Sequence, residues 1–327
     1  MIETKNLIFK KWHVSLAVFF LSISINAQKT EKFYNFKWEE CNANEAQYYA
    51  TTQKVDSGYL RKNYFIKQQK LLYSLNCKDS ICKIKNGEFI SLYSNGKIES
   101  KGIYVDNKRE GTWFNLYYNG KMKDSVFYSN GNPIGIRLSW YPNGFQHDSL
   151  YSSVEKSGAK VSWFDNGIPS SYGTFAAGQK KTGKWKYFHK NGKISAIETY
   201  QDLKLIDVKI FDEKGVLQNS TDIKDTPATF PGEEKKWARN IIDNIMSYFP
   251  EGFKLINTNK VSVVANFTIN EEGKTENVYL SVPFDDNLDQ IIIKAILNSP
   301  KWIPATNHNR KVKQDRKTPI SFSDKEP

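Results

Sequence analysis

Between residues 87 and 217, short aromatic and β-branched runs alternate with polar, glycine-containing turns. Runs of this composition are typical of β-strands. Asn-Gly pairs recur between the runs. Such a pair, flanked by strand-like segments, is the strongest local signal for a hairpin with a type I′ turn, which needs positive φ at both central residues. Looser turns separate one hairpin from the next. The pattern predicts two strands and two turns per unit, and therefore an antiparallel β-meander.

One motif, G-x-W-x-x-Φ-x-x-N-G-K-Φ, repeats along this stretch, with its clearest copies starting at Gly111 and Gly183. The turn glycines are 23 to 25 residues apart: Gly96, Gly120, Gly144, Gly167, Gly192 and Gly215. A period in this range indicates an array of units that bury their apolar faces only against their neighbours. Such arrays bind, brace or space other molecules more often than they catalyse.

An apolar column stands four residues before each turn glycine. It comprises Leu92, Leu116, Trp140, Trp163, Phe188 and Phe211. Side chains at equivalent positions of neighbouring strands stack, and each pair adds roughly 0.2–1 kcal/mol over alanine. We interpret the column as the core of a thin sheet. The alternative is an exposed aromatic stripe that contacts glycans or a partner.

The repeated motif resembles the MORN repeat, in the variant of the bacterial YwqK-type proteins. Five matching units cover residues 87–217, and degenerate strands extend the resemblance to about 58–217. The resemblance implies a hairpin array and leaves the function open, because proteins with this array have varied roles. Upstream, residues 28–86 are less regular. Tyr59–Ile66 and Lys70–Leu75 fit strands, Trp38–Tyr49 fits a short helix or a cap, and we expect the segment to cover the open edge of the first unit.

After Gly215 the glycine rhythm stops, and a polar linker over 218–227 leads into a different pattern. Apolar residues at helical spacing predict helices around 237–249 and 288–296. Residues 261–269 alternate without a break, as a half-buried strand does, and strands follow at 278–282 and 318–322. The order α-β-β-α-β predicts a two-layer α+β domain over 228–323. The fold class is thus mainly β with a small α+β domain.

This C-terminal stretch is similar to the C-terminal domain of the TonB energy-transducer family over about 226–323. The matching segments are Phe230-Pro-Gly-Glu-Glu234, Val263 to Gly273, Leu288-Asp289, Pro300 to Ala305 and Pro319 to Phe322. The resemblance implies that an extended plug peptide of an outer-membrane receptor adds a strand at the edge near the last strand. The implied docking residues are Thr318, Pro319, Ile320, Ser321 and Phe322. Lys260 and the glycine-free segment 307–312 depart from the family pattern at loops.

The first 27 residues have the layout of a secretory signal peptide. Lys5, Lys10 and Lys11 precede an apolar stretch, Val14–Ile25, that is shorter than the roughly 20 residues of a membrane span. Cleavage before Gln28 predicts an exported protein in the periplasm or associated with the outer membrane. The alternative is an uncleaved anchor, as in a TonB-type energy transducer for outer-membrane receptor transport.

The formal net charge is +12, and nearly all of the excess lies before residue 226. On an exported protein this charge favours an anionic envelope surface and makes nucleic acid an unsuitable partner. The alternative is that lysines protect sheet edges and keep a β-rich protein soluble.

Three cysteines are present. Cys77 and Cys82 are the preferred disulfide pair, because a four-residue loop would place them on facing strands of a hairpin. Cys41 would be free, although it could instead bridge either one. The sequence contains no recognisable metal-ligand spacing, carboxylate pair, Ser/His/Asp set or phosphate loop. We therefore expect a non-enzymatic cell-envelope adaptor without a cofactor. A protein partner would dock on the C-terminal domain, and the repeat sheet would be a spacer or an interaction platform.

Overall fold

A computed structural model describes residues 29–35, 37–219, 224–232, 234–248 and 260–323. The proposed signal peptide lies outside the described residues. The predicted meander is present as one antiparallel sheet of 16 strands, in which every strand pairs with its neighbours in sequence. Its strands are β1 (Thr30–Tyr34), β2 (Tyr48–Val55), β3 (Gly58–Phe65), β4 (Lys70–Cys77), β5 (Lys85–Leu92), β6 (Ile98–Val105), β7 (Lys108–Leu116), β8 (Met122–Ser129), β9 (Asn132–Trp140), β10 (Gln146–Ser152), β11 (Gly158–Trp163), β12 (Pro169–Ala176), β13 (Lys180–Phe188), β14 (Ile194–Gln201), β15 (Lys204–Phe211) and β16 (Leu217–Gln218). We call this sheet the array.

The segment Trp38–Tyr49 is not a helix, so that alternative is wrong. It forms turns up to residue 47 and enters β2 at Tyr48. The Trp38 ring stacks on Tyr48 with 4.3 Å between ring centroids. Trp38 therefore packs against the second strand of the sheet from a turn and not from a helix.

The type I′ turn predicted at the Asn-Gly pairs is also wrong. In the first such turn Gly96 donates its N–H to Tyr93 O at 2.9 Å, and the positive φ belongs to Gly96 (+81°) and not to Asn95. This is a type I turn followed by a left-handed residue, the usual geometry of hairpin loops longer than two residues. Turns with positive φ at both central residues occur at the other end of the strands, at Asp106-Asn107 and Asn130-Gly131. The turns that separate the Asn-Gly hairpins, which the sequence suggested were looser, are therefore tighter than the Asn-Gly turns.

The C-terminal domain contains the five elements predicted for it and one additional hairpin. Its elements are α1 (Glu234–Met246), β17 (Lys260–Ile269), β18 (Thr275–Val282), α2 (Asp286–Leu297), β19 (Ala305–Asn307), β20 (Arg310–Val312) and β21 (Gln314–Ser323). The three long strands form a sheet in the order β18-β17-β21. One face of β17, including Val263 and Phe267, packs with Trp237 and Ile292 of the helices in a single apolar core. The additional hairpin turns at His308 and Asn309, which both have positive φ without any glycine.

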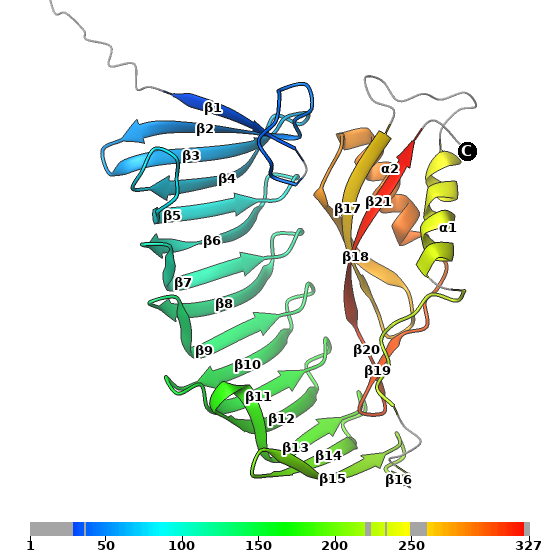
Figure 1. Ribbon diagram of the computed structural model, residues 1–327. Coiled ribbons are helices and arrows are strands. Elements are labelled where there is room, and N and C mark those ends of the chain that lie inside the picture. Colours follow the sequence, from blue (N-terminus) through cyan, green and yellow to red (C-terminus); the bar gives the residue numbers. More distant parts are fainter. Residues whose placement is uncertain (1–28, 36, 220–223, 233, 249–259, 324–327) are drawn as a thin grey trace, which may run out of the picture.

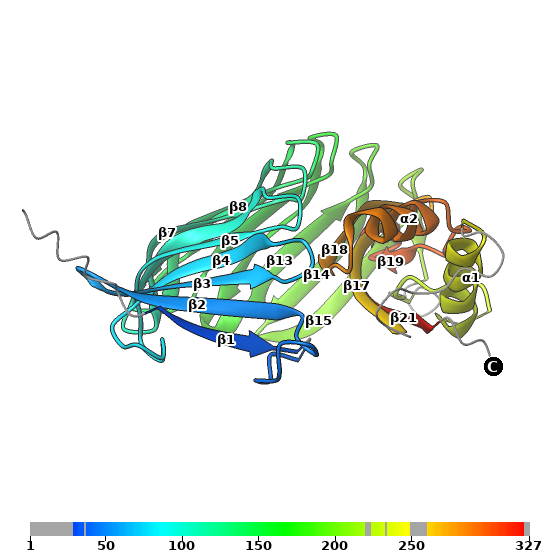
Figure 2. The same cartoon turned by 90° about the horizontal axis from the view of Figure 1, so that it is seen from above.

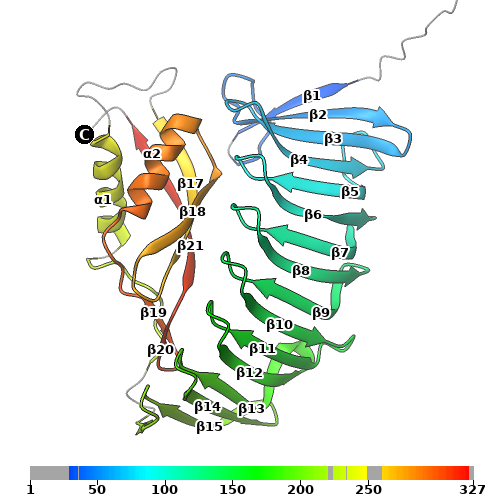
Figure 3. The same cartoon turned by 180° about the vertical axis from the view of Figure 1, so that it is seen from behind.

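The C-terminal domain lies alongside the array (Figure 1). Seen from above, it occupies one end of the array strands (Figure 2). Seen from behind, the array curves so that its last strands lie beneath the β19–β20 hairpin (Figure 3). The array therefore does not hold the domain at a distance, as a spacer would. It is the surface on which the chain's own C-terminal domain packs.

Candidate functional site

The residues implied for strand addition, 318–322, lie in β21. Within the described part of the chain β21 pairs only with β17, so its second edge has no neighbouring strand. Ile320 is 4% exposed and belongs to the apolar core, whereas Pro319 and Ser321 are exposed. Ser321 Oγ lies 2.9 Å from Ser262 Oγ on β17. The side chain of Phe322 lies outside the described residues.

Side chains from the first part of β21 contact the segment that leads into the domain. Ala228 N donates to Gln314 Oε1 at 2.6 Å, and Arg316 Nη2 donates to Ala228 O. These contacts involve the first half of β21, and the docking residues implied by the sequence lie in its second half.

The six turn glycines lie at the strand ends that face the C-terminal domain, where their neighbours link each turn to the next. Asn95 Oδ1 accepts from Lys97 N at 3.0 Å, and Asn95 Nδ2 donates to Tyr118 O at 2.8 Å. Lys97 Nζ donates to Asn119 O at 2.9 Å. The same bonds recur at Asn119, Lys121, Asn143, Asn191 and Lys193. This explains why asparagine and lysine repeat together with glycine.

The apolar column is half-buried at all six positions, so it is neither a closed core nor a free stripe. Its backbone carbonyls instead accept hydrogen bonds from the residue that follows the column in the preceding unit. Tyr93 Oη donates to Leu116 O at 2.8 Å, Tyr117 Oη to Trp140 O at 2.7 Å, and Tyr141 Oη to Trp163 O at 2.9 Å. His189 Nε2 lies 3.0 Å from Phe211 O. We call this series the hydroxyl ladder.

The hydroxyl ladder is interrupted at Phe164, which has no hydroxyl to offer to Phe188 O. Arg310 of β20 takes that place: its Nη1 donates to Phe188 O at 3.0 Å and also to Ser170 O. Its guanidinium lies 5.5 Å from the centre of the Phe164 ring. Burial lowers the pKa of Arg310. Because position 164 lacks a hydroxyl, Phe188 O is left to accept a hydrogen bond from a cation of the C-terminal domain.

The turn of the additional hairpin inserts next to a buried carboxylate. Glu198 of β14 accepts from Lys181 Nζ at 2.7 Å and from Tyr187 Oη at 2.8 Å, and His308 Nε2 lies 2.9 Å from its other oxygen. The His308 ring stacks on Tyr187 at 3.6 Å between centroids. Burial alone would raise the pKa of Glu198, but the hydrogen bonds from these three partners outweigh it and lower the pKa to about 2. Glu198 is therefore ionised over the whole physiological range.

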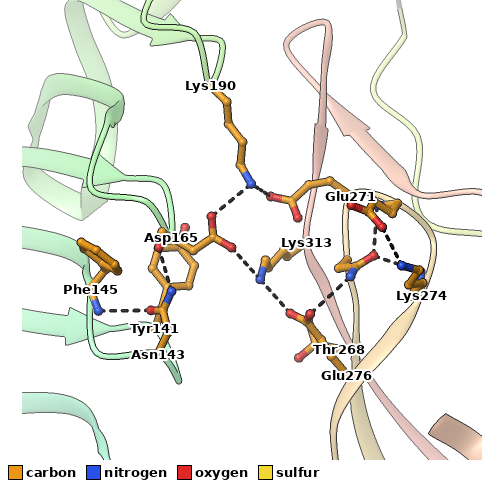
Figure 4. A network of polar contacts seen from close by, with 12 residues as sticks. Tyr141, Asn143, Phe145, Asp165, Lys190, Thr268, Glu271, Lys274, Glu276 and Lys313 are labelled. Atoms are coloured by element: carbon orange, nitrogen blue, oxygen red, sulfur yellow. Dashed lines mark hydrogen bonds and ion pairs between the residues drawn. The ribbon is translucent and has the colours of Figure 1, made fainter.

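A chain of ion pairs connects the two domains (Figure 4). Lys190 Nζ of the array lies 3.0 Å from Asp165 and 2.9 Å from Glu271 of the C-terminal domain. Lys313 Nζ lies 2.9 Å from Asp165 and 2.7 Å from Glu276. Burial would lower the pKa of Lys313, but its two carboxylates raise it. The network alternates in sign, so each charge is compensated.

The other end of the interface is held near the first strands. Gln47 Nε2 donates to Pro283 O at 3.1 Å, and Lys70 Nζ forms a 3.1 Å ion pair with Asp286. Lys67 Nζ lies 3.1 Å from the centre of the Phe284 ring. The C-terminal domain is therefore anchored at both ends of the array and in between.

The structure joins Cys77 to Cys82 and leaves Cys41 free. The two cysteines do not lie on facing strands, as expected, because Cys82 lies in the loop and Cys77 faces Lys85 across the strands. Among the described residues, no three His, Cys, Asp or Glu side chains are grouped so that they could hold a metal ion. No described helix is both long and apolar enough to cross a membrane.

Comparison with known families supports the array and shows no match for the TonB-like part. The MORN repeat variant matches at residues 85–106 and 181–202, which are the β5–β6 and β13–β14 hairpins. No curated protein matches the chain. MORN repeats suggest a binding or adaptor role based on the repeats.

The contacts between the domains were missed in the sequence. A signal existed for one part, since tyrosine follows the apolar column in three consecutive units and phenylalanine replaces it in the fourth. Nothing in the sequence indicated that Arg310 would fill the vacancy.

Proposed function

We propose that the protein is an exported, non-enzymatic adaptor of the cell envelope. The second half of β21, Thr318 to Phe322, takes up an extended peptide of a protein partner by strand addition, and the array is the rigid platform that holds this edge in place. The partner would be an outer-membrane receptor or another periplasmic protein. An anionic envelope surface could contact the basic array.

The observation that carries this proposal is the outer edge of β21, which pairs with no strand among the described residues, in a sheet that packs on a buried apolar core. Strand addition takes its affinity from backbone hydrogen bonds along such an edge. The edges of the array suit it less well. β1 carries Lys29, Glu31 and Lys32 at or beside its exposed end, and charges of this kind discourage pairing. β16 is only two residues long.

Pro319 determines which backbone groups an incoming strand could use. Proline occurs in edge strands with its nitrogen directed away from the partner strand. Since backbone groups alternate in direction along a strand, the outward N–H donors of this stretch belong to Lys317 and Ser321. A docked peptide should depend on these two donors and find none between them.

The test compares Ser321→Pro with Ser321→Ala. Both remove the hydroxyl next to Ser262, but only proline removes the outward N–H and places a ring where the peptide would lie. Linear peptides are first selected from a random display library on the full chain, and their affinities for both variants are measured by calorimetry. We expect Ser321→Ala to stay within about twofold of the unmodified chain and Ser321→Pro to lose at least about fivefold, since one backbone hydrogen bond contributes about 1 kcal/mol.

Hydrogen exchange on the unmodified chain gives an independent measurement. Peptide binding should slow exchange at the amides of Lys317 and Ser321. Equal affinities of the two variants, together with unchanged exchange at these amides, would contradict docking at this edge. The export part is tested separately by the mass of the protein from its own cells, which should begin at Gln28.

A further inference from the structure

The polar face of the C-terminal sheet and the turn end of the array enclose two adjoining cavities of about 390 and 360 Å³. They share six lining residues: Tyr117, Lys123, Pro142, Thr268, Asn277 and Asp315. The two cavities therefore form one cleft with walls from both domains. Its size lies in the usual range of small-ligand sites, which often occur between domains.

Aromatic rings form one wall of the smaller cavity. Tyr118 of the array stacks on Tyr279 of β18 with 5.5 Å between ring centroids, and Tyr93 packs edge-on against Tyr279 at 5.2 Å. Tyr117 is fixed by its place in the hydroxyl ladder. Burial raises the pKa of Tyr279 and of Tyr93. The rings are therefore uncharged, and each has a packing or hydrogen-bonding partner in the protein.

Two lysines, one from each domain, line the same cavity. Neither Lys123 of β8 nor Lys317 of β21 has a carboxylate within ion-pair distance in the described part of the chain. Nearby Lys190 and Lys313 each have two. Glu99 acts on both free lysines only at longer range, and burial raises the pKa of this carboxyl. Positive charge is thus left available beside the rings.

The remaining polar groups suit hydroxyls. Asn277 brings an amide to both cavities, whereas the amides of Asn119 and Asn266, which line the smaller one, already donate to Pro142 O and Ser281 Oγ. Asp315, whose Oδ1 accepts from Thr268 Oγ1 at 2.7 Å, lines both cavities. The larger cavity is lined by Arg137 and by three further carboxylates, each of which has a partner in the chain: Asp124 with Asn115, Asp148 with Lys160, and Glu271 with Lys190. Flat apolar rings, amides and a carboxylate together suit a ligand with a flat apolar side and many hydroxyls. The two free lysines add a preference for negative charge.

We propose that this cleft binds a short acidic oligosaccharide, with a carboxylate between Lys123 and Lys317 and its sugar rings against the tyrosines. A peptide fits less well, because the cleft lies against side chains of the C-terminal sheet, whereas strand addition uses the backbone groups of a strand edge. This site shares Lys317 with the edge proposed for strand addition: its side chain lines the cleft, whereas its backbone N–H belongs to the edge. Because Lys317→Gln keeps the N–H and Ser321→Pro keeps both lysines, either proposal can fail without the other.

The test uses the full chain and three probes: trigalacturonic acid, its methyl ester, and triglutamate. The ester keeps the shape of the sugar and removes its charge, while the peptide keeps the charge and removes the sugar. Calorimetry should show saturable binding of the acid, at least tenfold weaker binding of the ester, and weaker binding of the peptide. The double variant Lys123→Gln/Lys317→Gln should lose at least tenfold in affinity for the acid.

Lys209→Gln is the matched control, because Lys209 is exposed and its side chain alternates with buried Ile210 and so points to the opposite face of the array. It should bind the acid as the unmodified chain does. Ser321→Pro should also bind the acid normally, which separates this site from the docking edge. Absence of saturable binding of the acid overturns the proposal, as does equal affinity for acid and ester. Preference for triglutamate would assign the cleft to acidic peptides instead.

Discussion

Replacing Arg310 by methionine should loosen the C-terminal domain from the array, and adding Phe164→Tyr should partly restore the contact. Methionine keeps most of the length and removes the donors, so Ser170 O and Phe188 O lose their charged partner. Hydrogen bonds to charged groups contribute about 1.5–3 kcal/mol each, and an unsatisfied buried acceptor costs a similar amount.

Part of this loss is offset, because the variant no longer buries a positive charge. Burial lowers the pKa of Arg310, which is the sign of that cost. The net loss of free energy of docking should therefore be about 2–4 kcal/mol, below the sum of two full bonds. Tyrosine at position 164 can supply one neutral donor, to Phe188 O only, in the way that Tyr141 supplies Trp163 O. The rescue should thus be about 1 kcal/mol.

Native-state hydrogen exchange of the β19–β20 amides measures this quantity directly, because it reports the free energy of local opening. The four chains required are the unmodified one, each single variant and the double variant. In the presence of Arg310, Phe164→Tyr should bring no gain, since its acceptor is already occupied. If Phe164→Tyr changes the protection of these amides equally with and without Arg310, a tyrosine at position 164 and Arg310 do not compete for Phe188 O. The hydroxyl ladder would then not explain the contact of Arg310.

Two further predictions concern the array. Gly102→Ala should destabilise the fold by about 1–3 kcal/mol through overpacking, because the new Cβ would lie 2.2 Å from the buried Trp113 ring. Urea unfolding measures this loss, which should be smaller in a Trp113→Leu background; an equal loss in both backgrounds would exclude the clash. Glu198 has a pKa lowered from 4.5 to about 2, so its contribution to stability is complete above about pH 4.5 and is lost as the pH falls towards 2, up to about 3 kcal/mol. The stability difference between the unmodified chain and Glu198→Gln should therefore shrink between pH 6 and pH 3, and a difference that does not vary with pH would contradict this role.

The sequence was sufficient to predict those elements of the fold that follow from a local periodicity. The period of 23 to 25 residues predicted the meander, and the alternation from Val261 to Ile269 predicted the central strand of the second domain. The turn type was not predictable from Asn-Gly alone, because both turn geometries accept glycine in a left-handed conformation. The β19–β20 hairpin was missed for a related reason, since His308 and Asn309 adopt positive φ without the glycine that would have signalled it.

The packing of one domain on the other could not be read from periodicity at all. It depends on single residues that interrupt a pattern, such as Phe164, and on partners more than one hundred residues away, such as Arg310 and His308. Charges alone did not reveal it, because Lys190 and Lys313 look like ordinary surface lysines until their shared carboxylate Asp165 is known.

The two-ended attachment of the C-terminal domain also limits how many units the array can have. A solenoid with free ends can gain or lose a unit and still fold, since each unit contacts only its neighbours. Here Gln47 meets Pro283 near one end while Asn309 donates to Phe211 O near the other. One unit more or less, two strands wide, would shift one of these contacts by about 10 Å. The C-terminal domain therefore fits only one number of repeats. Duplication or loss of a whole repeat should prevent it from docking at both ends of the array at once.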